Sequence, residues 1–360
     1  MECKLVVESP TPMGRNVSLD VIRAVAIVCV IAGHFFSLNT EFRSVPYHGE
    51  LSLFVQGMGN FLFGIGVPLF IMLTGYLNVK KRDYSWAYVA GMKRVLLAYL
   101  FFSLVTVVFR KVYLQEELSW LKLGMKILDF SAIPYAWYIE MWIGLYLLTP
   151  LLNRAYDAFE GLKRQKEWML GILLALSAIP LLTNRYGMYL LPAYWDNTYP
   201  ILFFFIGRYI REFKPKVNWG GYSVLFILAI CALNPALSAV LANGHTMMSP
   251  IGHCFCLPGV AVAVAVFLLL LEVRDIRWEW LRRVVTSVSV ASLDIYLCCY
   301  ISDRLLYPWF KDHFFVDQCQ YGKWFFVIVP CLVIVSYLMA EAKCLLFNLC
   351  AKIASIKFYS

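Results

Sequence analysis

Two polar residues in the first apolar stretch of the chain have the types and spacing that chemistry would need. Arg23 and His34 are eleven residues apart, which is about three helical turns, so a helix would place both on one face. A rise of 1.5 Å per residue separates them by roughly 16 Å along the helix axis. One face of such a helix would therefore carry a fixed cation near one end and a titratable base near the other.

The stretch that holds these residues, 16–38, is long and apolar enough to cross a bilayer, which takes about 20 residues. Ionisable groups inside a membrane span are costly and mark a functional site by default. A structural interpretation stays open, because Asp20 could neutralise Arg23 and a single buried His34 could bond a backbone carbonyl. We favour the functional interpretation, with Asp20 as the partner of Arg23 rather than a catalytic acid.

The composition of the whole chain is that of a polytopic membrane protein. Of its 360 residues, 61% are hydrophobic and 15% are charged, whereas soluble domains are about half apolar and about a quarter charged. We expect an all-α transmembrane bundle that forms a single domain over residues 1–360, with a short N-terminal segment 1–15 and a C-terminal tail 347–360. The first span is expected to stay in the mature protein, because no signal peptide is evident. About ten spans are expected, near 18–38, 53–79, 95–109, 135–152, 168–183, 198–210, 220–241, 255–273, 287–306 and 323–346.

Basic residues are distributed unevenly among the segments between these spans. With both termini placed inside, the inner segments hold more than twice as many Lys and Arg residues as the outer ones. Because Lys and Arg gather on the cytoplasmic side of membrane proteins, we expect cytoplasmic N- and C-termini, with Arg23 toward the inside and His34 toward the outside. The same clustering explains the net charge of +9 without nucleic acid as a partner.

Three further polar residues lie inside predicted spans and are candidate supporting residues. Glu140 could orient a histidine or bind a sugar hydroxyl, and pairing with a neighbouring helix is an equal alternative. Asp294 and Tyr296 in the ninth expected span raise the same two possibilities. We expect these residues to contribute to a site that is centred on His34.

Metal and nucleotide-binding motifs are not evident in the sequence. Most of the eleven cysteines fall within apolar runs, where they pack as small apolar side chains. His253, Cys254 and Cys256 are close together but lack the spacing of a zinc site. No Gly-rich phosphate loop of known spacing occurs either. We therefore expect no bound metal and no bound cofactor.

Several segments, in order along most of the chain, resemble the integral-membrane acyltransferase 3 family. The first is LDVIRAVAIVCVIAGH, in which Arg23 and His34 match an arginine and a histidine that are separated by ten residues in that family. Later segments are similar to further helices of the family. These are PLFIMLTGYL (68–77), AWYIEMWIGLYLLTP (136–150), FFFIGRYI (203–210) and ASLDIYL (291–297).

The resemblance implies an O-acetyltransferase type of membrane enzyme that uses cytoplasmic acyl-CoA, most simply acetyl-CoA, as co-substrate. It implies that Arg23 and His34 are essential for acyl transfer. Arginine suits the phosphates of CoA because its guanidinium donates two parallel hydrogen bonds, so the candidate donor-binding residues are Arg94, Arg208 and Arg211, together with Arg23. For Arg94, Arg208 and Arg211, anchoring on the cytoplasmic side is an equal alternative.

His34 would act as general base on an acceptor hydroxyl, and a transient acyl-histidine is the second possibility. The pantetheine arm of CoA could run along the helix from Arg23 to His34. The sequence departs from the family at Thr74, Leu97 and Cys299, where a serine, a basic residue and a histidine are common. These departures leave the subfamily and the substrate open.

The expected acceptor is a glycan or a lipid-linked saccharide at the plasma membrane, the inner membrane in bacteria. Membrane lipids are the other expected partners, and the sequence does not predict an oligomeric state. A transporter or exporter of a glycan or an acyl-bearing substrate is the main alternative, because the Gly-rich second span could be a discontinuous helix. Against it, the Arg/His pattern of the first span is not repeated near the chain middle. A third possibility is a glycan-processing partner without acyltransferase activity.

Overall fold

A computed structural model describes residues 15–117, 119–184, 189–215, 221–241 and 244–357, with side chains to residue 350. Within these residues the chain is built from helices, and the one β-bridge joins Pro46 to Thr246. The first α-helices are α1 Val17–Leu38, α2 Leu51–Phe63, α3 Gly66–Leu77, α4 Trp86–Ala90, α5 Lys93–Val112, α6 Trp120–Leu128, α7 Trp137–Asp157 and α8 Lys163–Leu173. The others are α9 Pro180–Thr183, α10 Tyr199–Phe213, α11 Gly221–Leu241, α12 Leu257–Leu271, α13 Glu279–Phe314, α14 Gln318–Tyr321 and α15 Phe325–Lys357.

Seven helical stretches of the described chain are long and apolar enough to cross a membrane. They are Val17–Leu38, Leu51–Leu77, Trp86–Val112, Lys163–Thr183, Gly221–Leu241, Glu279–Phe314 and Gln318–Cys350. The three other expected spans coincide with α7, α10 and α12. Helix α7 has 21 residues but is not among the seven apolar stretches, and α10 and α12 have only 15 residues each, or about 22 Å. The all-α membrane architecture is confirmed, whereas the count of ten spans is not.

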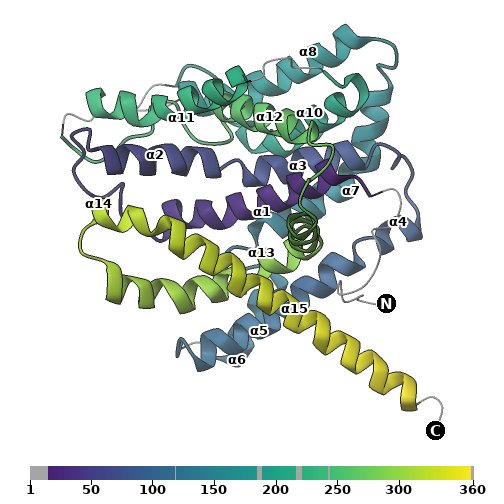
Figure 1. The fold of residues 1–360 in the computed structure, drawn as a ribbon. Coiled ribbons are helices and arrows are strands. Elements are labelled where there is room, and N and C mark those ends of the chain that lie inside the picture. Colours follow the sequence, from purple (N-terminus) through teal and green to yellow (C-terminus); the bar gives the residue numbers. More distant parts are fainter. Residues whose placement is uncertain (1–14, 118, 185–188, 216–220, 242–243, 358–360) are drawn as a thin grey trace.

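The structure describes only one of the two expected terminal segments. Residues 1–14 of the expected N-terminal segment lie outside the described residues. The expected tail 347–360 begins as helix, because α15 continues to Lys357, and residues 358–360 lie outside the described part. Figure 1 shows this last helix projecting beyond the rest of the bundle.

Helix α1 occupies the middle of the bundle, where it packs against α2, α3, α12, α13 and α15 (Figure 1). Its residues divide between two hydrophobic cores. Ile27 and Ile31 belong to the core formed with α13 and α15, whereas Ile22 and Ala26 belong to the core formed with α3, α10 and α12. Because apolar side chains surround α1 on both flanks, its two ends are held in a fixed relation to each other.

Helices α3 and α10 approach each other closely through a pair of glycines. A Cβ atom added to Gly75 would lie 1.9 Å from the backbone oxygen of Phe204, and one added to Gly207 would lie 1.9 Å from that of Met72. Small residues at such positions let membrane helices pack backbone to backbone. This contact fixes α10, and with it the arginines near its end, against α3.

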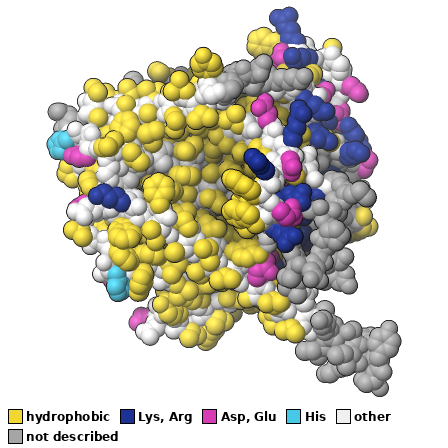
Figure 2. Space-filling model, viewed as in Figure 1, with side chains coloured by type: hydrophobic (Ala, Val, Ile, Leu, Met, Phe, Trp, Pro, Cys, Tyr) yellow, Lys and Arg dark blue, Asp and Glu magenta, His cyan; other side chains and the backbone are white. Residues whose placement is uncertain are grey.

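The charged side chains are concentrated at one end of the bundle. Figure 2 shows a broad hydrophobic face, with Lys and Arg side chains gathered together with Asp and Glu at the right-hand end. Histidine side chains appear at the opposite end of this face. This distribution is typical of a membrane protein with one basic side. The assignment of the basic end to the cytoplasm stays a prediction.

Candidate active site

Helix α1 places Arg23 and His34 near its opposite ends. The helix begins after Asn16, whose side chain accepts a hydrogen bond from the Ser18 backbone NH at 3.0 Å. It ends before Asn39, which donates to the carbonyl oxygen of His34 at 3.0 Å through its side chain. Both ends of α1 are therefore capped by asparagine side chains.

His34 lies against α13 and against the segment that precedes α7. Its Nδ1 atom is 3.7 Å from a carboxylate oxygen of Asp303 and 3.8 Å from the sulfur of Cys299. The His34 ring lies beside the ring of Tyr135, with 4.2 Å between the centroids. Its side chain is 14% exposed, so the imidazole is enclosed but not sealed off.

Asp303 is the carboxylate that faces His34, and it is 1% exposed. Its Oδ2 atom accepts hydrogen bonds from the Tyr135 hydroxyl at 3.0 Å and from the Asn39 side chain at 3.5 Å. Its Oδ1 atom is buried without a hydrogen-bond partner in the described part of the chain. A buried carboxylate with one free oxygen can stabilise a positive charge on the neighbouring imidazole.

Sequence reasoning missed Asp303, although a signal was present. Asp303 lies within the expected ninth span, seven residues after Tyr296 and four after Cys299, so α13 carries all three on one face. That periodicity could have identified it. The expected supporting carboxylates take other positions: Glu140 is exposed in the first turn of α7, and Asp294 forms an ion pair with Lys343 at 2.5 Å.

Tyr296 connects His34 to a cavity. Its hydroxyl donates a hydrogen bond to the carbonyl oxygen of Tyr135, the residue whose ring lies beside His34. Its ring packs against Tyr138, with 5.6 Å between the centroids. Tyr296 and Tyr138 both line a cavity of about 300 Å³ between α1, α3, α5, α7 and α13. Tyr296 therefore stands between this cavity and the surroundings of His34.

Arg23 lines the same cavity, together with Thr74 and Asn78. Its guanidinium is 3.5 Å from Asp20, and its side chain is 31% exposed. Asp20 binds Arg15 more closely, at 2.5 and 2.9 Å, and also accepts a hydrogen bond from Ser289 at 2.7 Å. The contact between Asp20 and Arg23 is therefore a long one, and the Arg23 guanidinium stays available to a ligand in the cavity.

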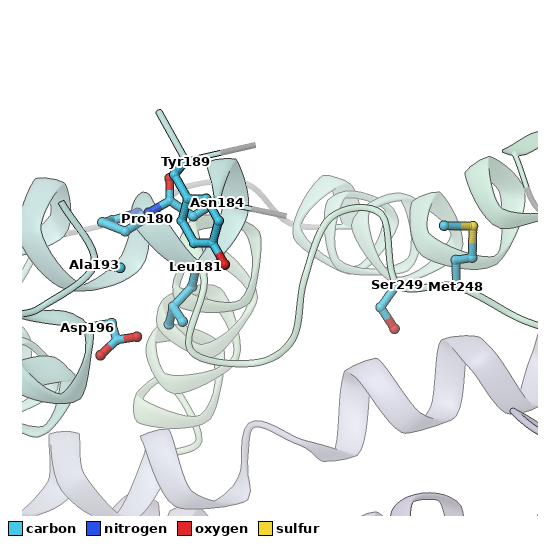
Figure 3. A pocket seen from close by; sticks show the side chains of 8 residues that line it. All are labelled: Pro180, Leu181, Asn184, Tyr189, Ala193, Asp196, Met248 and Ser249. Carbon is cyan, nitrogen blue, oxygen red and sulfur yellow. The ribbon is translucent and has the colours of Figure 1, made fainter. Parts of the chain in front are cut away.

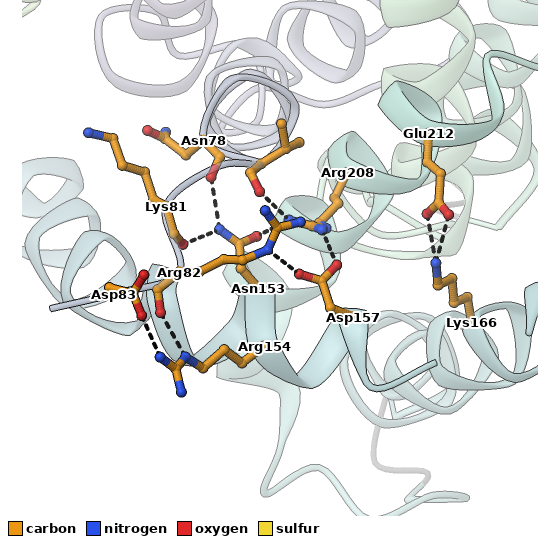
Figure 4. A network of polar contacts seen from close by, with 11 residues as sticks. Asn78, Lys81, Arg82, Asp83, Asn153, Arg154, Asp157, Lys166, Arg208 and Glu212 are labelled. Atoms are coloured by element: carbon orange, nitrogen blue, oxygen red, sulfur yellow. Dashed lines mark hydrogen bonds and ion pairs between the residues drawn. The ribbon is translucent and has the colours of Figure 1, made fainter. Parts of the chain in front are cut away.

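The three other candidate donor-binding arginines lie in different surroundings. Arg208 is buried in a polar network, where it binds the side chain of Asn153, Asp157 at 2.5 Å and the carbonyl oxygen of Val79 at 3.1 Å (Figure 4). Arg211 lies over the ring of Tyr76, 4.9 Å from its centroid. Arg94 is exposed at the start of α5. Among the four predicted donor-binding arginines, only Arg23 lines the cavity.

The network around Arg208 lies at the basic end of the bundle, where further ion pairs and hydrogen bonds connect the helices. Arg154 binds the carbonyl oxygen of Arg82 and the carboxylate of Asp83, and a separate pair joins Lys166 to Glu212 at 2.7 Å (Figure 4). Lys166 is 2% exposed, so its buried positive charge is balanced by the carboxylate of Glu212. These contacts tie α7, α8 and α10 together, and they are structural.

A family comparison decides the class of this site. The acyltransferase 3 family model, described as an acyltransferase domain, matches residues 16–341. This chain belongs to the acyltransferase 3 family. No curated protein and no solved structure gives a significant match.

Membership of the acyltransferase 3 family, together with the apolar helices, makes this a multi-pass integral membrane protein with an acyltransferase domain. The match begins at the residue that caps α1 and includes Arg23, His34 and Asp303. It favours acyl transfer over the transporter alternative. Within the described residues, no group of three or more His, Cys, Asp and Glu side chains could hold a metal ion.

Proposed function

We propose that this acyltransferase moves an acyl group, most simply acetyl, from cytoplasmic acyl-CoA to a hydroxyl of a glycan at the outer side of the plasma membrane, the inner membrane in bacteria. The observation that carries the proposal is the division of labour along α1. Arg23 lines a cavity near one end of the helix, and His34 faces Asp303 near the other. The acceptor is a surface glycan or a lipid-linked saccharide.

The cavity suits the arm of the donor rather than its nucleotide. Its walls are mainly apolar, with Arg23 and Asn78 among the few polar side chains, and it extends to Tyr296. The phosphates of CoA would bind Arg23, because guanidinium groups recognise phosphate oxygens in pairs. The pantetheine arm would then follow α1 over the roughly 16 Å toward His34.

The chemistry follows from the two nitrogens of His34. When Nδ1 carries its proton and faces Asp303, the lone pair of Nε2 is free to accept the proton of an acceptor hydroxyl. The hydroxyl oxygen attacks the thioester carbonyl carbon, the C–S bond breaks, and the CoA thiolate takes the proton from His34. An ester and free CoA result. Asp303 stabilises the imidazolium while it exists.

Transient acylation of His34 itself is the second route, with the same donor and products. In that route Nε2 attacks the thioester carbonyl carbon and the C–S bond breaks to release CoA. The acceptor hydroxyl oxygen then attacks the same carbon, which forms the ester and breaks the bond to Nε2. Rapid quenching of the enzyme with acyl-CoA in the absence of acceptor, followed by mass spectrometry of the α1 peptide, separates the two. Acylated His34 supports this second route, and its absence together with active transfer supports general-base catalysis.

Surface glycans from cells with and without the protein test the proposed reaction. Mass spectrometry should find an O-acyl group that depends on the protein, and the purified protein in nanodiscs should bind acetyl-CoA. For sidedness, a reporter fused after Lys81 should lie in the cytoplasm and one inserted in the segment between α5 and α7 should lie outside. Identical glycans in both strains and no binding of acyl-CoA would overturn the proposal.

A further inference from the structure

A second, larger cleft lies outside the site described above. Its volume is about 550 Å³, which falls within the range of about 300–1,000 Å³ typical of small-molecule sites. One wall comes from residues in 180–184 and 189–196 and the other from Met248 and Ser249, as Figure 3 shows. The cleft is broadly open at the molecular surface, so it suits part of a larger ligand better than an enclosed small molecule.

The cleft lies at the same end of the bundle as His34. Helix α1 ends at Leu38, four residues after His34, and the following segment pairs with the 245–246 segment. The Tyr47 backbone NH donates to the carbonyl oxygen of His245 at 3.0 Å, and Pro46 forms a β-bridge with Thr246. Met248 and Ser249 follow directly, so this wall of the cleft is tied to the chain that leaves the His34 end of α1.

Hydrogen bonds from buried side chains fix the wall that holds Met248 and Ser249. Ser238 is fully buried and accepts a hydrogen bond from the Met248 backbone NH at 2.8 Å. Asn234 is also buried, accepts from the Ile251 backbone NH at 2.9 Å and donates to the Gly252 carbonyl oxygen at 3.0 Å. Both anchors come from α11.

A single asparagine organises the opposite wall. The Oδ1 atom of Asn184 accepts hydrogen bonds from the backbone NH groups of Leu190 and Leu191 at 2.9 and 3.0 Å. Its amide nitrogen donates to the carbonyl oxygen of Leu191 at 2.5 Å. Side-chain bonds to the backbone therefore hold the described parts of both walls, which lowers the entropy lost when a ligand binds to them.

The groups that remain available in the cleft are a carboxylate and an aromatic ring. Asp196 and Tyr189 line it, and within the described residues neither side chain makes a hydrogen bond or ion pair. Tyr189 is 82% exposed. A carboxylate accepts hydrogen bonds from hydroxyl groups, and an aromatic face packs against the C–H groups of a sugar ring.

From these features we infer that the cleft binds the saccharide acceptor, an inference that rests on the proposed function. Asp196 accepts hydrogen bonds from hydroxyl groups of the saccharide, and Tyr189 packs against one face of a sugar ring. Binding here holds the glycan at the His34 end of the bundle while a hydroxyl further along it reaches His34. Asp196 and Tyr189 are therefore acceptor-binding residues, and they take no part in the bond-making step.

Binding of short oligosaccharides to the full chain in nanodiscs tests the cleft directly. The probe is the surface polysaccharide of the producing strain, freed of acyl groups with mild alkali and cut to short oligosaccharides. Asp196→Asn and Tyr189→Ala should each weaken binding about tenfold, the effect of one hydrogen bond to a charged group or one packed ring. Tyr194→Ala is the matched control, because Tyr194 is 89% exposed on the same segment and does not line the cleft. It should bind within twofold of the unchanged protein.

Steady-state kinetics separate an acceptor site from a general loss of activity. The cleft variants should raise the KM for the oligosaccharide about tenfold and leave kcat and the KM for acetyl-CoA within twofold. Comparing the free oligosaccharide with the lipid-linked precursor extracted from membranes shows which form the cleft takes, because only the preferred form will show the larger KM change.

Two results would overturn the inference while leaving the proposed function intact. One is active acyl transfer with unchanged oligosaccharide KM in both cleft variants, and the other is an equal loss of binding in the Tyr194→Ala control. Failure of the proposed function is recognised separately, as absence of acetyl-CoA binding and of acyl transfer by the unchanged protein.

Discussion

Replacing Asp303 with asparagine tests the central pairing of the site most sharply. The amide can still accept the hydrogen bond from the Tyr135 hydroxyl, but it removes the negative charge 3.7 Å from His34. With an effective dielectric constant of about 20, two unit charges at this distance attract by about 4.5 kcal/mol. Since about 1.4 kcal/mol corresponds to a factor of ten, losing most of this attraction should lower kcat by about 10²–10³-fold.

The fold should tolerate this change. Among the described residues, buried Asp303 contacts no cation other than a protonated His34, so removing its charge leaves no partner unpaired. Turnover is measured with labelled acetyl-CoA and the native glycan, and donor binding is measured separately. Asp312→Asn on the exposed surface of the same helix is the matched control and should keep full turnover. An Asp303→Asn enzyme within threefold of the unchanged protein would refute the role of this carboxylate.

Further predictions concern both ends of α1 and the helix packing. His34→Ala and His34→Gln should each lower kcat by about 10²–10⁴-fold with acetyl-CoA binding retained, since neither side chain accepts the proton; active His34→Ala enzyme would exclude the mechanism. Arg23→Lys should weaken acetyl-CoA binding more than tenfold, because lysine lacks the paired donors of a guanidinium, and unchanged donor affinity would make Arg23 a structural residue. Gly207→Ala should lower stability by about 2 kcal/mol, because its Cβ would lie 1.9 Å from a backbone oxygen of α3. Thermal unfolding in detergent measures this, with Gly144→Ala as a neutral control in open space, and equal midpoints would contradict the packing argument.

The sequence was sufficient for what depends on one helix at a time. The length and hydropathy of the first apolar stretch predicted α1 and placed Arg23 and His34 on it, and both lie where expected. The partner of His34 depends on how α1 packs against α13. Asp303 lies 269 positions after His34 in the chain, so no local sequence pattern indicates that the two residues are in contact. A pattern confined to one helix therefore indicates Glu140 and Asp294 as readily as Asp303.

The sequence alone also does not show which arginines are buried in contacts with other protein side chains. Arg208 and Arg211 follow an apolar run, a pattern shared by arginines that bind ligands and arginines that bind the protein itself. Only the packing of α10 against α3 and α7 shows that Arg208 is occupied by Asn153 and Asp157. The count of ten spans is unconfirmed for a similar reason, since α10 and α12 are short helices that pack among longer neighbours.

The position of α1 between two hydrophobic cores has a consequence for how the enzyme works. Because α1 is packed along both flanks, it is a rigid element whose length does not change during the reaction. The distance from Arg23 to His34 is then a fixed property of the protein. Under the proposed function, the flexible partner would be the arm of the donor, and the acyl group would cross the membrane region by the length of that arm, without the bundle opening first to one side and then to the other.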